Sequence, residues 1–365
     1  MHLKELSIIN FKNYADAEFI FSDKINAFVG DNGAGKTNIL EAIYYLSFTK
    51  SYSHQVDLLN IKEGEDFFLI KGNYIKNDDE LNVSCGVKRD KKKSFKKNNK
   101  EYKKISDHIG LIPLVMISPS DYQLISGASD ERRRFIDSVI SQYDRQYLEI
   151  LIKYNKAVQQ RNKLLKQFAE SNFFDKDLLS AFDDVLINSG NEIFEKRTKF
   201  ITELVPVFQK YYKYISGGKE NVSLEYKSAL NETNMQDLLT QNLQKDRIST
   251  YTTGGIHKDD LLLNIGNFAI KKSGSQGQQK TFLIALKLAQ FDFMSKINGL
   301  KPILLFDDIF DKLDSKRVEH IISLVLDNNF GQIFMTDANK YRIDRILSKI
   351  SENYKVFEIE NGKRK

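Results

Sequence analysis

An apolar run from Ile25 to Val29 ends in the octet Gly30 to Thr37, and apolar residues at helical spacing follow from Asn38 to Phe48. The octet reads GDNGAGKT and matches the pattern G-x-x-x-x-G-K-[ST], which requires this context of strand, loop and helix. Glycines let backbone N–H groups turn inward around a phosphate, and the start of a helix adds a favourable dipole. The chain is therefore expected to contain an α/β layer that binds a nucleotide through this loop, rather than a purely structural glycine turn.

The chemistry of such a loop assigns roles to two side chains. Lys36 would reach the β- and γ-phosphates, and the Thr37 hydroxyl would ligate Mg²⁺. ATP and Mg²⁺ are therefore the expected ligands. The residues expected to contact the nucleotide are Gly30, Asp31, Asn32, Gly33, Ala34, Gly35, Lys36, Thr37 and Asn38.

A second apolar run, Ile303 to Phe306, ends in the adjacent carboxylates Asp307 and Asp308. Paired acids after a buried strand are typical of a site at the carboxyl edge of a parallel sheet. Asp307 is expected to hold Mg²⁺, and Asp308 to polarise the attacking water as a catalytic residue beside Lys36. The alternative is a solvated strand end.

Small and polar residues open a predicted helix from Gln276 to Met294. By itself this start, with Ser275, Gly277 and Gln278, would be an ordinary helix cap. Its position just upstream of the acidic strand resembles the signature motif of ABC-type ATPases. That resemblance implies that Ser275, as a catalytic residue, and the Gly277 amide face the γ-phosphate bound by a second subunit, with Gln278 as a further nucleotide contact.

The middle of the chain has a different character. Tyr147 to Phe168 and Leu178 to Tyr214 are long, charged and amphipathic, which predicts a helical domain or an antiparallel helix pair. Strands expected at Phe67 to Tyr74 and Leu81 to Lys88 indicate an antiparallel β layer near the N-terminus. The predicted fold is an α/β ABC-type ATPase head, with a mixed phosphate-loop sheet and an antiparallel layer. Residues 1–117 and 249–365 would form this head, and residues 118–248 an inserted, mainly helical lobe.

The basic charge is concentrated in one segment. Lys88 to Lys104 contains ten Lys or Arg residues and two acidic ones. Its local net charge, ten minus two or +8, exceeds the net charge of +6 of the whole chain. We expect a hairpin with Asn98 and Asn99 at its turn, and it is either a solvated face or a contact for a phosphate backbone. The run Arg132 to Arg134 likewise either contacts DNA or pairs with acidic side chains.

Composition excludes several other classes. A hydrophobic content of 41% is enough for real cores, and no apolar run approaches the roughly 18 residues of a membrane span. The single Cys85 can form no internal disulfide, which indicates a reducing cytoplasm and excludes a thiolate metal site. His257 beside Asp259 and Asp260 is more typical of hydrogen-bonded structural groups than of metal ligands.

Short motifs spread along nearly the whole chain form one recognisable set. They are NFKNY at 10–14, GDNGAGKTN at 30–38, SPSD at 118–121, Gly127 and RRRFID at 132–137, QRN at 160–162, GIHKDD at 255–260, SQGQQKT at 275–281 and LLFDDIFDKLD at 304–314. Together they resemble the bacterial RecF family of ABC-type, SMC-like ATPases.

The resemblance implies a two-lobed protein that binds ATP between two head-to-tail subunits, with Lys12 and Asn13 among the nucleotide contacts. It also implies a weak, DNA-stimulated ATPase that associates with duplex DNA near single-strand gaps, at the nucleoid. Such a protein helps RecO and RecR to load the recombinase RecA in repair and replication restart. A homodimer whose DNA affinity responds to ATP is physically sensible for such a split site.

Three departures from related ATPases remain. Asp308 stands where many ABC-type ATPases have Glu, so slow turnover is expected. Thr336 and Asp337 end a strand that in transporter-type relatives ends in His, which leaves the γ-phosphate sensor open. Asp314, after Asp311 and Leu313, resembles the dimer-contact loop that follows the acidic strand in such ATPases. The alternative for Asp314 is an exposed acidic residue in a turn.

The alternative function is the ATPase subunit of an ABC-type transporter. Three features count against it: the strand ending at Asp337, the opening Asn10 to Tyr14 and the helical insertion.

Overall fold

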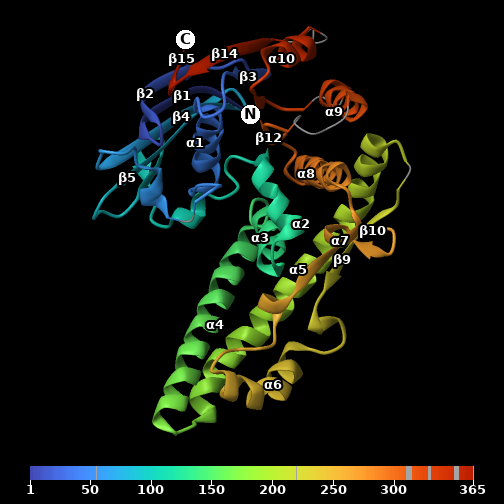
Figure 1. Ribbon diagram of the computed structural model, residues 1–365. Helices are drawn as coiled ribbons and strands as arrows, with labels where there is room; N and C mark the ends of the chain where they lie inside the picture. Colours follow the sequence, from blue (N-terminus) through green and yellow to red (C-terminus); the bar gives the residue numbers. More distant parts are fainter. Residues whose placement is uncertain (55, 219, 310–314, 328–329, 349–352, 365) are drawn as a thin grey trace. The chain divides into compact units, whose positions relative to one another are not determined.

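The computed structural model describes residues 1–54, 56–218, 220–309, 315–327, 330–348 and 353–364 (Figure 1). The chain divides into two compact units. The first unit comprises Met1–Asp121, Tyr214–Gly217 and Gln276–Lys365, and the second comprises Tyr122–Lys213 and Gly218–Ser275. Each is described by itself below.

A mainly parallel sheet forms the centre of the first unit. Its strand order is β15-β14-β3-β13-β12-β8; β14, β3, β13, β12 and β8 run parallel to one another, and β15 pairs antiparallel with β14. The bounds are β3 (Ile25–Val29), β8 (Leu114–Ile117), β12 (Ile303–Asp307), β13 (Ile333–Asp337), β14 (Tyr354–Glu360) and β15 (Lys363–Arg364). Strands β3, β12 and β13 are buried along their whole length, which explains why their sequences are apolar runs without alternation.

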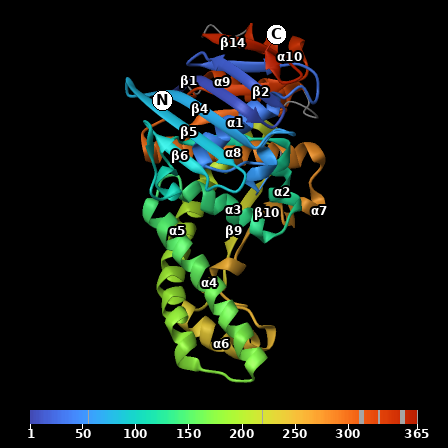
Figure 2. The same ribbon diagram turned by 90° about the vertical axis from the view of Figure 1, so that its left-hand side faces the viewer.

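An antiparallel sheet forms the second layer of this unit, in the order β2-β1-β4-β5-β6-β7 (Figure 2). The bounds are β1 (His2–Phe11), β2 (Tyr14–Ile20), β4 (Phe67–Lys76), β5 (Asp79–Lys88), β6 (Ser94–Lys97) and β7 (Lys100–Glu101). The predicted hairpin is confirmed, because Asn98 and Asn99 both have positive φ between β6 and β7. Asparagine tolerates this left-handed conformation better than most residues do.

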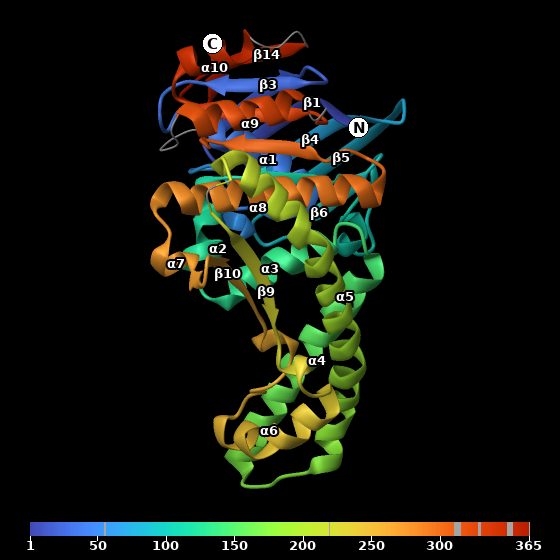
Figure 3. The same cartoon turned by 90° about the vertical axis from the view of Figure 1, so that its right-hand side faces the viewer.

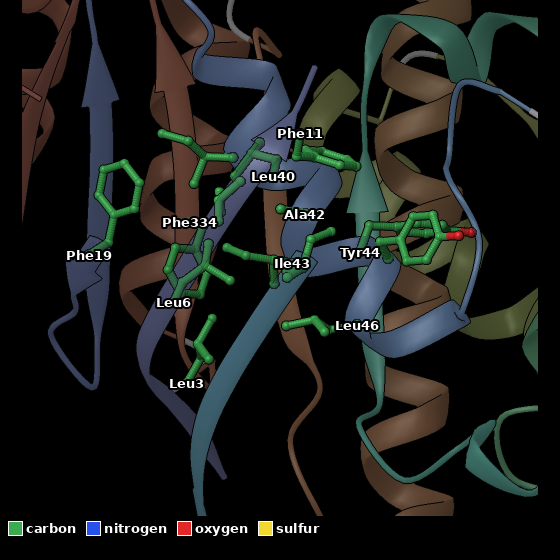
Figure 4. Close-up of a cluster of buried hydrophobic side chains, with 14 of the residues drawn as sticks. Leu3, Leu6, Phe11, Phe19, Leu40, Ala42, Ile43, Tyr44, Leu46 and Phe334 are labelled. Carbon is green, nitrogen blue, oxygen red and sulfur yellow. The ribbon is translucent and has the colours of Figure 1, made fainter. Parts of the chain in front are cut away.

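The core lies between the two sheets, around helix α1 (Lys36–Phe48). Leu3 and Leu6 of β1, Leu40 and Ile43 of α1, and Phe334 of β13 are buried in one cluster (Figure 4). Sheets cover α1 on two sides, so its sequence carries little polar surface beyond the first turn. This packing holds the start of α1 against the ends of the parallel strands.

Helices α8 (Gln276–Asn298), α9 (Ser315–Asp327) and α10 (Lys340–Leu347) complete the first unit (Figure 3). The Gln332 side chain joins the N-terminal and C-terminal segments of the unit, because its amide donates to the carbonyl oxygens of Leu3 and Ser22 and accepts from the Leu3 N–H. Among the residues that the structure describes, no helix is both long and apolar enough to cross a bilayer.

The second unit is mainly helical. Its helices are α2 (Gln123–Ser126), α3 (Ser129–Ile140), α4 (Arg145–Ser171), α5 (Lys176–Ser216, whose last residues belong to the first unit), α6 (Met235–Ser249) and α7 (Ile270–Ser273). Asp144, which caps the start of α4, pairs with Lys196 of α5, whereas Arg161 further along α4 pairs with the earlier Asp183 of α5. The two helices therefore run antiparallel, which is the second of the two predicted alternatives. Short 3-10 helices in the chain are η1 (Asp57–Asn60), η2 (Ile105–His108), η3 (Pro119–Tyr122), η4 (Ala229–Asn231) and η5 (Ile256–Lys258).

The division of the chain differs from the predicted boundaries at 117/118 and 248/249, and falls at 121/122 and 275/276. The larger difference has a clear cause in a small sheet of the second unit. Strand β10 (Asp260–Ile265) pairs with β9 (Val222–Lys227) and with β11 (Phe268–Ala269). Backbone hydrogen bonds therefore tie residues 260–269 to the helical unit, which periodicity within one segment does not reveal.

Candidate nucleotide-binding site

Parallel pairing brings the ends of three strands together. Asp307 of β12 is the register partner of Thr336 of β13, and Thr336 is the partner of Phe28 of β3, two residues before Gly30. The acidic strand end and the glycine-rich loop therefore meet at one edge of the sheet, although about 270 residues of chain separate them.

The glycines of the loop occupy positions that other residues would not fit. Gly30 has φ +150°, and a Cβ there would lie 2.2 Å from the Ile359 carbonyl oxygen; Gly35 has φ +113°, and a Cβ there would lie 2.5 Å from Asn13 Nδ2. Ala34 lies between them, and its carbonyl accepts from Asn13 Nδ2 at 3.2 Å and from the Gly362 N–H at 2.9 Å. The loop is thus braced by the β1–β2 turn and by the β14–β15 hairpin.

Lys36 points back into this loop. Its side chain is buried, and Nζ donates to the carbonyl oxygens of Gly30 at 2.7 Å and Asp31 at 2.9 Å. The Lys36 ammonium is buried at the start of a helix and lies next to the glycines of the loop. Such a position suits the binding of phosphate oxygens. The residues present therefore fit the phosphates of a nucleotide.

A hydroxyl and a carboxylate meet next to the loop. Thr37 Oγ1 donates to Asp307 Oδ1 at 2.8 Å, and Thr336 Oγ1 donates to the same oxygen at 2.7 Å. Burial raises the pKa of the Asp307 carboxyl above its ordinary value, the carboxylates of Asp308 and Glu41 raise it further, and the two threonine hydrogen bonds oppose the shift. Hydroxyl and carboxylate oxygens are ligands that Mg²⁺ prefers, so Thr37 and Asp307 fit the metal role expected of them.

The raised pKa has a consequence for stability. We expect Asp307→Asn to increase the free energy of unfolding at neutral pH, because the amide oxygen still accepts from both threonines and the buried charge is gone. A carboxyl whose folded-state pKa is raised costs stability at high pH; this cost decreases as pH falls through the folded-state pKa and is gone below the unfolded-state pKa. The gain should therefore shrink toward zero below about pH 3, under the ordinary Asp pKa of about 3.9. Thermal unfolding of both proteins across this pH range checks it, and a variant that is less stable at neutral pH would contradict it.

Thr336 also contacts Asp308, the residue that follows Asp307. Asp308 has φ +46°, and its backbone N–H donates to Thr336 Oγ1 at 3.0 Å. Thr336 thus links both acidic residues. Sequence reasoning missed this role, although the strand ending at Thr336 and Asp337 was the available signal. Asp337 is also engaged, since it accepts from Arg342 Nη1 at 3.1 Å.

The β1–β2 turn places Lys12 and Asn13 beside the loop. Asn38 Nδ2 donates to Asn13 Oδ1 at 2.7 Å, so Asn13 contacts both Ala34 inside the loop and the residue that follows the loop. Lys12 Nζ lies 3.2 Å from Ser53 Oγ and 3.5 Å from Glu41 Oε1. Asp31, Asn32, Gly33 and Thr37 are exposed around this turn.

The signature residues lie at the start of α8. Ser275 immediately precedes the helix, and Thr281 Oγ1 donates to the Gly277 carbonyl at 2.8 Å. A Cβ on Gly277 would lie 2.6 Å from Arg317 Nη1 of α9, so a glycine lets this guanidinium approach the helix start. Ser275 and Gln278 also have partners of their own. Asp314, with Asp311 and Leu313, lies outside the described residues.

The GIHKDD block has a structural role within the second unit. His257 Nδ1 contacts the Tyr154 hydroxyl at 2.8 Å and Nε2 contacts the Thr252 carbonyl at 3.0 Å, while burial lowers the pKa of His257 to about 4. Asp260 receives two hydrogen bonds from Arg132, at 2.6 and 3.0 Å. Asp259 accepts from the Tyr226 hydroxyl. These groups hold the loop before β10.

The arginine run is occupied by contacts inside the same unit. Arg132 binds Asp260, Arg133 Nη1 donates to the Asp259 carbonyl at 2.6 Å, and Arg134 pairs with Asp130 and Glu131 of its own helix. Of the two alternatives for this run, the structure supports pairing with acidic and carbonyl groups.

Comparison with known proteins agrees with this geometry. The family model described as the RecF/RecN/SMC N terminal domain matches residues 2–365. The chain is 52% identical over 364 residues to the DNA replication and repair protein RecF of Phocaeicola vulgatus, covering 99% of this chain and 97% of that protein. It is 51% identical over 359 residues to RecF of Flavobacterium johnsoniae, covering 98% and 100%.

Solved structures give the same result. The recombination mediator protein RecF with ATP superposes with a TM-score of 0.90 at 29% identity, covering all of this chain and 97% of that one. An Smc head bound to a domain of ScpA has a TM-score of 0.61 at 15% identity, which reflects the shared head fold alone. The fold is the ABC-type, SMC-like head with a helical insert, as predicted, and none of these relatives is a transporter. The chain belongs to the RecF family.

Proposed function

We propose that this protein is an ATP-dependent DNA-binding protein of recombinational repair and replication restart. ATP and Mg²⁺ would close a homodimer on duplex DNA near single-strand gaps, and slow hydrolysis would reopen it. The observation that carries the proposal is the 2.8 Å contact between Thr37 and Asp307, which joins the phosphate loop to the acidic strand in a chain similar to RecF along its whole length. By the same similarity, RecO and RecR would be its partners in loading RecA, in the cytoplasm at the nucleoid.

The side chains at the sheet edge suggest how hydrolysis would proceed. Lys36 would exchange its loop carbonyls for the β- and γ-phosphate oxygens, and Thr37 and Asp307 would hold Mg²⁺, which supplies charge neutralisation when bound. Asp308 would accept the proton of the attacking water. The shorter Asp side chain holds that water less closely than Glu would, so the expected turnover is slow, which suits a clamp.

A second copy of the chain would complete the site. Ser275 and the Gly277 amide open α8, where a helix start would present backbone N–H groups and a positive dipole to a γ-phosphate. In a head-to-tail pair each copy would present this helix start to the nucleotide on the other. Two such sites per dimer follow from twofold symmetry.

The β6–β7 hairpin is the favoured DNA contact. The Lys96, Lys97 and Lys100 side chains are exposed there, whereas the arginines at 132–134 are engaged within the protein. Lys93 differs from its neighbours, because Nζ pairs with Asp57 at 2.7 Å and so contributes to the fold. A row of exposed ammonium groups on an edge hairpin suits the phosphates of DNA.

Removing these lysines should reduce the salt dependence of DNA binding. Changing Lys96, Lys97 and Lys100 together to Gln should lower the slope of log K against log [salt] by about 0.9 for each phosphate that the hairpin no longer neutralises. Binding of gapped duplex DNA, measured by fluorescence anisotropy over a salt series with ATP present, checks this. The matched control changes Lys153, Lys156 and Lys166, which are exposed on α4. A reduced slope in the control variant, together with an unchanged slope in the hairpin variant, would place the DNA contact on α4 instead.

ATP hydrolysis with gapped duplex DNA, with lipid vesicles and without either tests the proposal as a whole. We expect slow hydrolysis that DNA accelerates and vesicles leave unchanged. Hydrolysis that DNA does not alter would count against a DNA-responsive ATPase.

A further inference from the structure

A chain of buried and half-buried polar groups joins the two helices that carry the halves of the candidate site. It consists of Glu41, Tyr52, Asp121 and Lys287, all in the first unit, and is called the polar relay below. Glu41 lies on α1, which begins with Lys36 and Thr37 at the phosphate loop. Lys287 lies on α8, which begins next to Ser275 and Gly277.

The first link holds a loop against α1. The Glu41 carboxylate accepts from Ser51 Oγ at 2.8 Å, from the Tyr52 N–H at 3.1 Å and from the Ser53 N–H at 3.0 Å. Its side chain is 1% exposed, and Lys12 Nζ, beside the loop-binding Asn13, lies 3.5 Å from its Oε1. Glu41 thus ties residues 51–53 to both α1 and the β1–β2 turn.

The second link continues from this loop to α8. The Tyr52 hydroxyl donates to Asp121 Oδ1, and the Lys287 ammonium lies 2.7 Å from the same oxygen. The other oxygen, Asp121 Oδ2, accepts from the Ser118 N–H at 2.8 Å, which fixes the carboxylate just after β8. Lys287 and Asp121 are 8% and 4% exposed, so water offers little competition for this ion pair.

Burial of two carboxylates and an ammonium is costly, and an apolar contact between the helices would be cheaper. A satisfied buried network, in contrast to an apolar contact, holds one relative position of the groups it joins. Lys287 lies eleven residues after Gln276, roughly 16 Å along the axis of α8, and a helix of this length moves as one body. The relay therefore connects α1 and Lys12 to the helix that begins beside the signature residues.

We propose that the polar relay couples occupation of the phosphate loop to the position of the signature helix in the same chain. Tyr52, Asp121 and Lys287 are positioning residues in this scheme and contact no substrate. A nucleotide that attracts Lys12 and the start of α1 changes the partners of Glu41, and the loop at 51–53 passes this change to Asp121 and α8. The inference rests on the proposed function, because the signature helix acts on the nucleotide of a second copy.

Tyr52→Phe tests the relay, because it removes one hydroxyl and keeps the ring. We expect the affinity of the isolated chain for ATP to stay within about twofold, while ATP-driven association and kcat each fall about tenfold, the effect of losing a hydrogen bond to a charged group. Tyr74→Phe is the matched control: Tyr74 is fully buried, and its hydroxyl has no hydrogen-bond partner among the described residues. Titration calorimetry with ATP, sedimentation with and without ATP, and steady-state hydrolysis are measured for all three proteins, together with thermal unfolding.

The outcomes separate the relay from the proposed function. If the native chain neither associates nor hydrolyses ATP, the proposed function fails and the relay falls with it. If the native chain does both and Tyr52→Phe matches Tyr74→Phe, the relay alone is overturned. Lys287→Gln tests the same relay if Tyr52→Phe folds poorly. The double variant should have a kcat only slightly lower than that of either single variant. Reductions in kcat that simply multiply would show that the two residues act independently.

Discussion

Lys36→Met should lower the rate of ATP hydrolysis by at least about 100-fold, the effect of removing one preorganised charge from a phosphoryl-transfer site. The native ammonium is already held in the loop by the carbonyls of Gly30 and Asp31, so it needs little rearrangement to reach a phosphate. Methionine has a similar length but carries no charge and donates no hydrogen bond. Steady-state hydrolysis at saturating ATP measures the reduction.

The control for this change is Lys166→Met, at an exposed position on α4. It alters the net charge by the same amount and should leave hydrolysis unchanged. Circular dichroism should show that both variants keep the native helix content. Hydrolysis by Lys36→Met within about threefold of the native rate would contradict the assignment of this loop as the nucleotide site, because removal of a catalytic charge costs far more.

Arg161→Met should have the largest effect on stability, a decrease of about 3–5 kcal/mol in the free energy of unfolding. The Arg161 side chain is fully buried, and Nε and Nη1 each lie 2.6 Å from a carboxylate, on Asp183 and Asp246 respectively. Asp246 is itself fully buried, so removal of the guanidinium leaves a negative charge without its cation. Denaturant unfolding followed through the helical signal measures the decrease.

Arg134→Met is the comparison for that experiment. Arg134 also contacts two carboxylates, but its side chain is 49% exposed. An exposed ion pair is worth at most about 1 kcal/mol, so this variant should stay close to the native chain. Equal decreases in the two variants would mean that burial does not govern the strength of the Arg161 cluster.

The sequence alone predicted much of this architecture. The apolar runs at Ile25–Val29 and Ile303–Phe306 became buried strands of one sheet, because runs of this kind suit only a sheet covered on both faces. Amphipathic periodicity predicted the long helices of the second unit and left a helical domain or an antiparallel pair as the alternatives. The phosphate loop could be placed because its chemistry demands glycines and a lysine at fixed spacing.

What the sequence did not reveal depends on pairing between distant segments. Gly362 and Ile359 brace the phosphate loop from the C-terminal hairpin, and no local pattern links them to residues 30–35. The role of Thr336 follows only from its register beside Asp307. Arg161 stood in a recognisable motif, yet its function as a buried clamp on Asp246 required the fold.

The most direct test of the composite site mixes two inactive proteins, Lys36→Met and Ser275→Arg. In a head-to-tail dimer the mixed pair contains one site with an intact phosphate loop and an intact signature helix start. Random pairing of equal amounts should therefore restore about one quarter of the native hydrolysis rate if the sites act independently. A mixture that stays inactive while sedimentation shows dimers, or a Ser275→Arg protein that is active by itself, would contradict a site shared between two copies.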